Sequence, residues 1–344
     1  MSVMTYIGAI GAAQREAMDA DERVIIIGED VEANVYGTTG GSKSRAESGD
    51  FVQMYGRSRI RNTPIAEEAI VGAAIGAAMT GLRPIVDLSY SSFLYMAMDQ
   101  LVNQAAKNRY MFGGQNSIPV VFRSAMFYGL NTGAHHSDRP YPMFMNVPGL
   151  KVVVPASASD AKGLLRSAVD SDDPVLIFEA CPLWGLKEEV DDAEYKIPFG
   201  QARVRREGSD VTVVAISGAV PLALKAAEQM AEQGISCDVI DPRTLVPLDS
   251  ATIVASVKRT GRLVIADPAH RTCGAAAEIS AIVADEAYSA LRAPIKRVTA
   301  VDMQVPFSPA LEPAIYPTTE KIAAAIEAVT KTEKRAKDTR RVDA

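Results

Sequence analysis

The chain contains the stretch Asn62-Thr63-Pro64-Ile65-Ala66-Glu67-Glu68, which is followed by a run of small residues that ends at Gly81. Thr63 can cap a helix that begins at Pro64, because the first turn leaves backbone N–H groups without partners and proline has none. Gly81 can end the same helix, since glycine adopts the left-handed conformation at little cost. The stretch therefore predicts a helix with two carboxylates in its first turn.

These two carboxylates have two interpretations. Acidic residues at a helix start complement the helix dipole, and residue type alone favours this interpretation. Alternatively, one of the acids lies at the edge of an apolar pocket formed with Ile65, Ile70, Val71 and Ile75. Desolvation would then raise the pKa of that carboxyl group and suit it to proton transfer. Other parts of the chain have to decide between the two.

Length and composition indicate an ordinary globular protein of two domains. The 344 residues exceed what one hydrophobic core usually supports, and 48% hydrophobic with 23% charged residues is typical of soluble domains. The net charge of −6, without a basic stripe, argues against broad binding to nucleic acid. No apolar run is long enough to cross a membrane, and the N-terminus does not resemble a secretory signal. We therefore expect a cytoplasmic protein.

Cysteine usage agrees with that compartment. Cys181, Cys237 and Cys273 are odd in number, lie far apart and form no C-x-x-C pair. The simplest expectation is three buried thiols in a reducing environment.

Short apolar runs alternate with helical patterns along the whole chain. In the first half, strands are expected at residues 24–28, 84–88, 118–123, 151–155 and 175–179. Continuous apolar runs of this length are typical of buried parallel strands, so we predict α/β domains with largely parallel sheets.

The same patterns suggest where the domains end. We place the first domain at residues 1–186 and an acidic, aperiodic linker at 187–199. A second, smaller βα series follows at 200–330, and a polar tail at 331–344.

Candidate functional residues follow the predicted strands, where open α/β sheets bind their ligands. Glu29 comes directly after the first strand, and the adjacent His135 and His136 lie in the loop after the third. A Gly-rich loop is expected at 35–48, but its glycines match neither a dinucleotide fingerprint nor a phosphate-binding loop.

The histidine pair alone does not define a known kind of site. Adjacent histidines usually point in different directions, and the remaining His270 lies in the other domain, so a metal site is weakly supported. Ser137, His136 and Asp138 are consecutive and rarely reach the geometry of a catalytic triad. An exposed pair without a function is equally compatible with residue type.

A series of motifs runs in order along nearly the whole chain, from Thr5 to Val329. The motifs are Asn62-Thr63-Pro64-Ile65-Ala66-Glu67, Gly72-Ala73-Ala74-Ile75-Gly76, Gly81-Leu82-Arg83-Pro84, Tyr110-Met111-Phe112-Gly113-Gly114, His136-Ser137, Pro148-Gly149-Leu150-Lys151, Asp241-Pro242-Arg243-Thr244 and Val305-Pro306-Phe307-Ser308. In this order they resemble the beta subunit of the thiamine-diphosphate-dependent first component of 2-oxo acid dehydrogenase complexes. The acetoin and pyruvate branches of that family are the most similar.

The resemblance implies a pyrimidine-binding thiamine-diphosphate domain followed by a transketolase C-terminal-like domain. It implies that Glu67 hydrogen-bonds a pyrimidine nitrogen and so promotes deprotonation of the thiazolium carbon. It also implies that Phe93 packs on the pyrimidine, with Ile65 and Ser89 lining the pocket and Glu29 close to the cofactor.

His136 matches the family's active-site histidine, which assists carbonyl chemistry and acyl transfer to lipoamide. Imidazole can move a proton near neutral pH without special perturbation. The chain departs from the family here, because His135 and Asp138 stand where glutamines are usual and the loop at 127–132 is bulkier. The sequence therefore leaves the 2-oxo acid or ketone substrate open.

The resemblance also implies partners. The chain lacks the Gly-Asp-Gly motif with a downstream Asn that holds magnesium and diphosphate, so an alpha subunit would supply that half in an alpha2beta2 heterotetramer. The small residues Gly72 and Gly76 would let a partner helix approach, although a contact inside the monomer would use them equally well. The second domain would face a lipoyl acyltransferase core.

A structural potassium ion is the last implication of the resemblance. It would be held by the backbone carbonyls of Val120, Ala168, Ser171 and Asp173.

The expected function is acyl transfer from a 2-oxo acid or acetoin to lipoamide. Two alternatives stay open at this point: a transketolase-like carbanion transferase that works outside a complex, and a scaffold subunit without catalytic residues.

Overall fold

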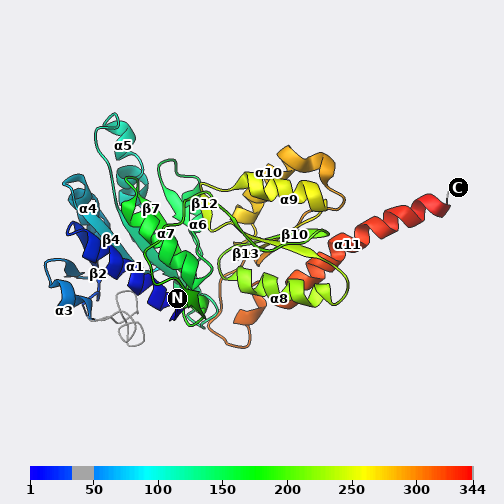
Figure 1. Cartoon of the computed structure of the whole chain (residues 1–344), viewed down its shortest axis with the longest axis horizontal. Coiled ribbons are helices and arrows are strands. Elements are labelled where there is room, and N and C mark those ends of the chain that lie inside the picture. The colour runs from blue at the N-terminus through cyan, green and yellow to red at the C-terminus, as the bar shows by residue number, and fades with distance from the viewer. Residues whose placement is uncertain (33–49, 343–344) are drawn as a thin grey trace. The chain divides into compact units, whose positions relative to one another are not determined.

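The computed structural model describes residues 1–32 and 50–342, with side chains described up to residue 331. The chain divides into two compact units, Met1–Phe199 and Gly200–Ala344, and each is an α/β unit (Figure 1). The loop predicted at 35–48 lies outside the described residues.

Six strands of the first unit form a parallel sheet in the order β6-β7-β5-β4-β2-β3. The bounds are β2 Val24–Glu29, β3 Ile60–Thr63, β4 Arg83–Tyr90, β5 Val121–Met126, β6 Lys151–Val153 and β7 Val175–Ala180. Every residue of β5 and β7 is buried, which agrees with the largely apolar runs from which these strands are predicted. The parallel order places the carboxyl ends of β2, β4 and β5 along one edge.

Helices of the first unit are α1 Tyr6–Ala20, α3 Phe51–Tyr55, α4 Glu67–Met79, α5 Asn108–Met111, α6 Tyr141–Met145 and α7 Ala158–Asp170. Helices α1 and α7 pack against each other, and α4 packs on β4. The helical segment between β4 and α5 is irregular, with a 3-10 turn at Ser91–Ala97 and a π-type segment at Gln100–Ala105 before α5.

The predicted cap of the central helix is wrong. Helix α4 begins at Glu67 after Ala66, whose side chain cannot cap it, while Thr63 is the last residue of β3 and pairs with Glu29. Pairing with a strand distant in sequence draws Thr63 into an extended conformation and overrides the local capping pattern. Gly81 does adopt a left-handed conformation, with φ of +104°, just after the helix ends.

The segment predicted as a linker at 187–199 belongs to the first unit. Strand β8 (Lys187–Val190) pairs antiparallel with β1 (Ser2–Thr5). Residues 191–197 then lie along α7, where Lys162 Nζ donates to the carbonyls of Asp191 and Ala193 at 2.7 and 3.0 Å.

Gly163 of α7 permits this close packing. A Cβ at Gly163 would lie 2.7 Å from side-chain atoms of both Tyr195 and Ile197. The Ile197 amide donates to the Gly163 carbonyl at 3.2 Å, and Tyr195 Oη donates to the Ser159 carbonyl at 2.7 Å. We refer to residues 187–199 as the strap.

The second unit has a five-stranded sheet in the order β14-β13-β10-β11-β9, in which the edge strand β9 runs antiparallel to β11. The bounds are β9 Arg203–Arg206, β10 Val211–Ala215, β11 Cys237–Asp241, β13 Leu263–His270 and β14 Lys296–Ala300, with a short β12 at Thr244–Val246. Helices α9 (Ser250–Thr260) and α10 (Ala275–Ala287) lie on one face of this sheet, and α8 (Ala219–Ala231) and α11 (Thr319–Val342) lie on the other (Figure 1).

Helix α11 continues to Val342, so the backbone of the predicted polar tail is helical almost throughout. The expectation of three buried thiols needs correction. Cys181 and Cys237 are buried as expected, but Cys273 is exposed because it follows β13 in a turn with φ of +52°. In the described part of the chain, no helix combines the length and the apolar character that a membrane span requires.

Candidate functional site

The carboxyl edge of the first sheet carries two neighbouring acids, Glu29 and Glu67. Glu29 ends β2, and Glu67 begins α4 a few residues after β3, the strand that pairs with β2. Both side chains are half-buried. Burial raises the pKa of the Glu29 carboxyl, and the nearby charges of Asp30 and Glu67 raise it further. The fold therefore brings two sequence-predicted acids within electrostatic reach of each other.

Ser89 lies on this edge in an unusual backbone conformation. Its φ is +50°, and the pairing of β4 with β5 shifts register between Asp87 and Tyr90. The Ser89 amide donates to Asp87 Oδ1 at 2.9 Å. Non-glycine residues in this region are strained and persist only where surrounding contacts hold them.

Asp87 belongs to a buried charged cluster behind the edge. Arg123 of β5 donates from Nε and Nη2 to the two carboxylate oxygens of Glu179 in β7, at 2.7 and 3.1 Å. Arg123 Nη1 also lies 4.0 Å from Asp87 Oδ2. All three side chains are buried, so the cluster joins β4, β5 and β7 beneath the Ser89 turn.

Aromatic rings surround His136 at the same edge. His136 lies in a short turn after β5, and its ring meets those of Tyr90 and Phe93 edge-on at centroid distances of 4.5 and 5.8 Å. Phe127 stacks on Tyr90 at 4.2 Å and contacts Trp184 at 5.4 Å. The fold thus brings together the predicted residues Phe93 and His136, which are 43 positions apart (136 − 93).

Two hydroxyl groups tie the histidine turn to the segment after β4. Ser92 Oγ donates to the His135 carbonyl at 2.5 Å, and Ser91 Oγ donates to the Asp138 carbonyl at 2.7 Å. His135 is exposed, whereas His136 is half-buried among the rings. The two adjacent histidines therefore have different surroundings, and only His136 is held in the cluster.

A triad is not formed at this turn. The Ser137 hydroxyl is buried and shares a hydrogen bond with Thr132 Oγ1 at 2.8 Å rather than with His136. Within the described ranges, no group of three or more His, Cys, Asp or Glu side chains is arranged to hold a metal ion.

Ile65 does not join Ile70, Val71 and Ile75, with which it is predicted to form an apolar pocket beside the two acids. Ile70, Val71 and Ile75 are buried, whereas Ile65 is 75% exposed because it precedes the helix. The exposed side of α4 includes the small residues Ala69, Ala73 and Gly76, beside Glu68 and Met79.

The four carbonyls predicted to hold potassium all accept hydrogen bonds. The donors are the Val175 amide to Val120, the Ser171 amide to Ala168, Arg83 Nη1 to Ser171, and Ser171 Oγ to Asp173. Arg83 and Lys151 also place positive charge here, because Lys151 Nζ lies 2.8 Å from Asp173 Oδ2. A carbonyl oxygen has two lone pairs, so accepting one hydrogen bond does not prevent it from also binding a cation. The potassium site therefore stays a prediction.

Sequence reasoning missed Asp87, Tyr90, Phe127 and Trp184. The available signal is weak: Tyr90 and Phe127 are aromatic residues that lie a few positions beyond the ends of two predicted strands. Nothing local connects either of them with Trp184.

The fold and two domain matches place the chain in the transketolase class of proteins. The family described as the pyrimidine binding domain of transketolase matches residues 2–183, and that described as the transketolase C-terminal domain matches residues 200–322. A solved split-gene transketolase has a TM-score of 0.78 at 22% identity and covers 96% of this chain and 99% of its own. That likeness concerns the fold.

Curated relatives narrow the class to one family. The acetoin:2,6-dichlorophenolindophenol oxidoreductase subunit beta of Bacillus subtilis is 44% identical over 93% of this chain and 95% of its own length. The 2-oxoisovalerate dehydrogenase subunit beta of the same species is 39% identical over 95% and 98%. A mitochondrial pyruvate dehydrogenase E1 subunit beta of Arabidopsis thaliana is 40% identical over 94% and 88%. The chain belongs to this family of dehydrogenase E1 beta subunits, and the transferase alternative is not favoured.

Proposed function

We propose that this chain is the beta subunit of a thiamine-diphosphate-dependent dehydrogenase for a 2-oxo acid or acetoin, and that it contributes catalytic residues. The observation that carries the proposal is the grouping of Glu29, Glu67, Phe93 and His136 on one sheet edge. Relatives at about 40% identity along almost the whole chain support the same reaction class.

The residues at this edge fit the pyrimidine half of the cofactor. A half-buried carboxyl at Glu67 can bond a ring nitrogen, and the half-buried ring of Phe93 offers a face or edge to a flat heterocycle. When bound, thiamine diphosphate supplies a carbon nucleophile that attacks the substrate carbonyl. In this proposal Glu67 holds and exchanges the proton at the pyrimidine ring, and Glu29 adds negative potential beside it.

His136 acts at the substrate side. Its imidazole can donate or accept a proton near neutral pH, and the rings of Tyr90 and Phe93 keep it in one orientation. The same rings exclude water from one side of the site. We assign His136 to protonation of the substrate carbonyl oxygen and to delivery of the acyl group to lipoamide.

An alpha subunit completes the site in this proposal. The outer side of α4 carries Ala69, Ala73 and Gly76, and small side chains let a partner helix approach closely. We propose an alpha2beta2 heterotetramer in which the alpha chain holds magnesium and the diphosphate. A lipoyl acyltransferase core as acceptor, potassium at the carbonyl set and a cytoplasmic location complete the prediction.

A matched pair of variants tests the assignment of Glu67. Glu67 and Glu68 are adjacent, but Glu68 is exposed and accepts a hydrogen bond from Gln100 at 3.1 Å. In the chain reconstituted with its alpha subunit, Glu67→Gln should lower turnover with an artificial electron acceptor by roughly 100-fold or more. Glu68→Gln should leave turnover close to that of the wild type. Equal turnover in both variants would show that Glu67 is not the proton partner.

The substrate is identified by a screen on the reconstituted pair. Pyruvate, branched 2-oxo acids and acetoin are each offered with the artificial acceptor, and with lipoamide in a parallel series. Turnover of at least one of them, with acyl transfer to lipoamide, supports the dehydrogenase assignment. Transfer to an aldehyde acceptor alone would instead indicate a transferase.

A further inference from the structure

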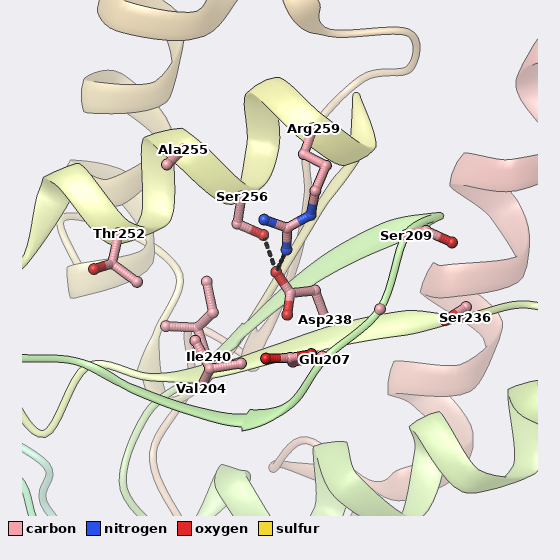
Figure 2. Close-up of a pocket in the computed structure, with 11 residues that line it drawn as sticks. Val204, Glu207, Ser209, Ser236, Asp238, Ile240, Thr252, Ala255, Ser256 and Arg259 are labelled. Carbon is pink, nitrogen blue, oxygen red and sulfur yellow. Dashed lines mark hydrogen bonds and ion pairs between the residues drawn. The ribbon is translucent and has the colours of Figure 1, made fainter.

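The second unit contains an open cavity of about 670 Å³ that shares no residue with the site at the sheet edge of the first unit. It lies between the edge strand β9, strand β11 and helix α9 (Figure 2). Strand β9 and the turn after it supply Val204 and Glu207, β11 supplies Asp238 and Ile240, and α9 supplies Arg259. A cavity of this size can hold a small organic molecule.

Asp238 is the central polar residue of this cavity. Its side chain is 1% exposed, and its Oδ2 accepts hydrogen bonds from Ser256 Oγ at 2.5 Å and from Arg259 Nη2. Its Oδ1 is buried and has no hydrogen-bond partner among the described residues. Figure 2 shows this second oxygen directed away from Ser256 and toward the side of Glu207.

The surrounding packing prevents Asp238 from satisfying Oδ1 by turning. Ser256, which holds Oδ2, is itself fixed by a hydrogen bond of 2.7 Å with Thr212 Oγ1. On the other side, a Cβ at Gly208 would collide with the backbone of Cys237 and Asp238, so the turn after β9 lies directly on β11. A buried acceptor without a donor is unfavourable, and a donor on a molecule bound in the cavity would satisfy it.

The charges of the cavity specify the kind of donor. Two carboxylates, Asp238 and Glu207, face one guanidinium, and that of Arg259 already donates to Asp238. The balance favours a cation that carries several N–H donors. Val204, which is 43% exposed, and the exposed Ala255 add an apolar surface on which an aliphatic group can pack.

We propose that this cavity binds a small aliphatic compound with a primary ammonium group, which donates to Asp238 Oδ1 and faces Glu207. A free amine and an amino acid share this chemistry. Arg259 is 55% exposed and has further N–H groups, so the carboxylate of an amino acid can bind beside the ammonium. The site is independent of the proposed reaction.

Three probes with the same carbon body separate these contributions. Isoamylamine carries only the ammonium, 4-methylpentanoate carries only the carboxylate, and leucine carries both. Each is titrated into the full chain by calorimetry and by saturation-transfer NMR, up to roughly ten times a millimolar Kd. Isoamylamine or leucine should bind and 4-methylpentanoate should not. Tighter binding of leucine indicates an amino acid site, and tighter binding of isoamylamine indicates an amine site.

Variants locate the binding. Asp238→Asn should weaken ammonium binding at least tenfold, and Glu207→Gln should weaken it about threefold, whereas Glu232→Gln at the exposed end of α8 should have no effect. If Asp238→Asn does not fold, Ala255→Trp takes its place, because Ala255 is exposed and a large side chain there fills the cavity. Absence of binding by both ammonium probes, or unchanged binding in Ala255→Trp or folded Asp238→Asn, overturns the proposal.

Discussion

The carboxylate of Asp87 accepts a hydrogen bond from the backbone amide of Ser89, two residues further on, and this bond holds Ser89 in a left-handed conformation. The turn redirects β4 into the segment that carries Phe93. Asp87 therefore links the buried charged cluster to the predicted cofactor pocket.

Replacing Asp87 should loosen that turn. Asp87→Ala removes the acceptor for the Ser89 amide and one neighbour of the buried Arg123. We expect the free energy of unfolding to fall by about 2 kcal/mol. Asp87→Asn keeps an oxygen acceptor and should lose less. Urea denaturation of the three proteins measures the difference, and equal losses would mean that the Ser89 bond contributes nothing.

Ser89→Gly should be tolerated at this turn. Glycine adopts a positive φ without steric cost, so the substitution relieves strain of about 1 kcal/mol, although it also makes the unfolded chain more flexible. The net change in the free energy of unfolding should be small, whereas Ser89→Val should be destabilising. A stable valine variant would show that the turn is not strained. Both variants are compared by denaturation and by cofactor affinity in the reconstituted pair.

The ion pair between Arg123 and Glu179 should be costly to break. Both side chains are 1% exposed, so Glu179→Gln leaves a buried guanidinium without its anion. We expect a loss of about 3 kcal/mol in the free energy of unfolding. The control is Asp21→Asn, which breaks a surface pair with Arg23. That variant should unfold at nearly the wild-type denaturant concentration.

Glu29 should make stability depend on pH. Its pKa is raised in the folded chain above the ordinary value of 4.5, so the folded state binds this proton more tightly than the unfolded state does. Stability contributed by that proton is present below the unfolded pKa and is lost as pH rises through the folded pKa. Glu29→Gln should therefore be more stable than the wild type at neutral pH, and the advantage should shrink toward pH 4.5. Glu22→Gln, an exposed acid, should show no such trend in denaturation midpoints.

The two adjacent histidines should differ in activity. His136 is held among aromatic rings, whereas His135 is exposed. In the reconstituted pair, His136→Asn should lower turnover roughly 100-fold, and His135→Asn should change it only slightly. Measuring kcat and KM for each variant checks this. A larger loss in His135→Asn would reverse the assignment.

Much of the fold is predictable from local pattern. Apolar runs such as those of β2 and β7 are buried on both faces, and burial of that kind leaves an uninterrupted signal in the sequence. The position of Thr63 was predicted wrongly because its pairing with Glu29 joins two strands about thirty residues apart. A local cap pattern carries no information about such a partner.

The candidate site was predictable only in part. His136 is a candidate from its place after a predicted strand, but the roles of Phe93 and His136 come from resemblance to a family, since nothing in their spacing indicates that they meet. Tyr90, Phe127 and Trp184 come from the ends of three different elements and are joined only by the order of the strands. Asp238 likewise becomes notable only when its burial and its unpartnered oxygen are known.

The strap has a practical consequence for dividing this gene. A fragment ending at Leu186 would match the composition boundary, yet it would remove the strand that pairs with β1 and the carbonyls bonded by Lys162. A cut after Phe199 keeps those contacts with the first unit. A split version of the protein should therefore be cut at the Phe199–Gly200 peptide bond. A second protein inserted between the two halves should be placed at the same bond.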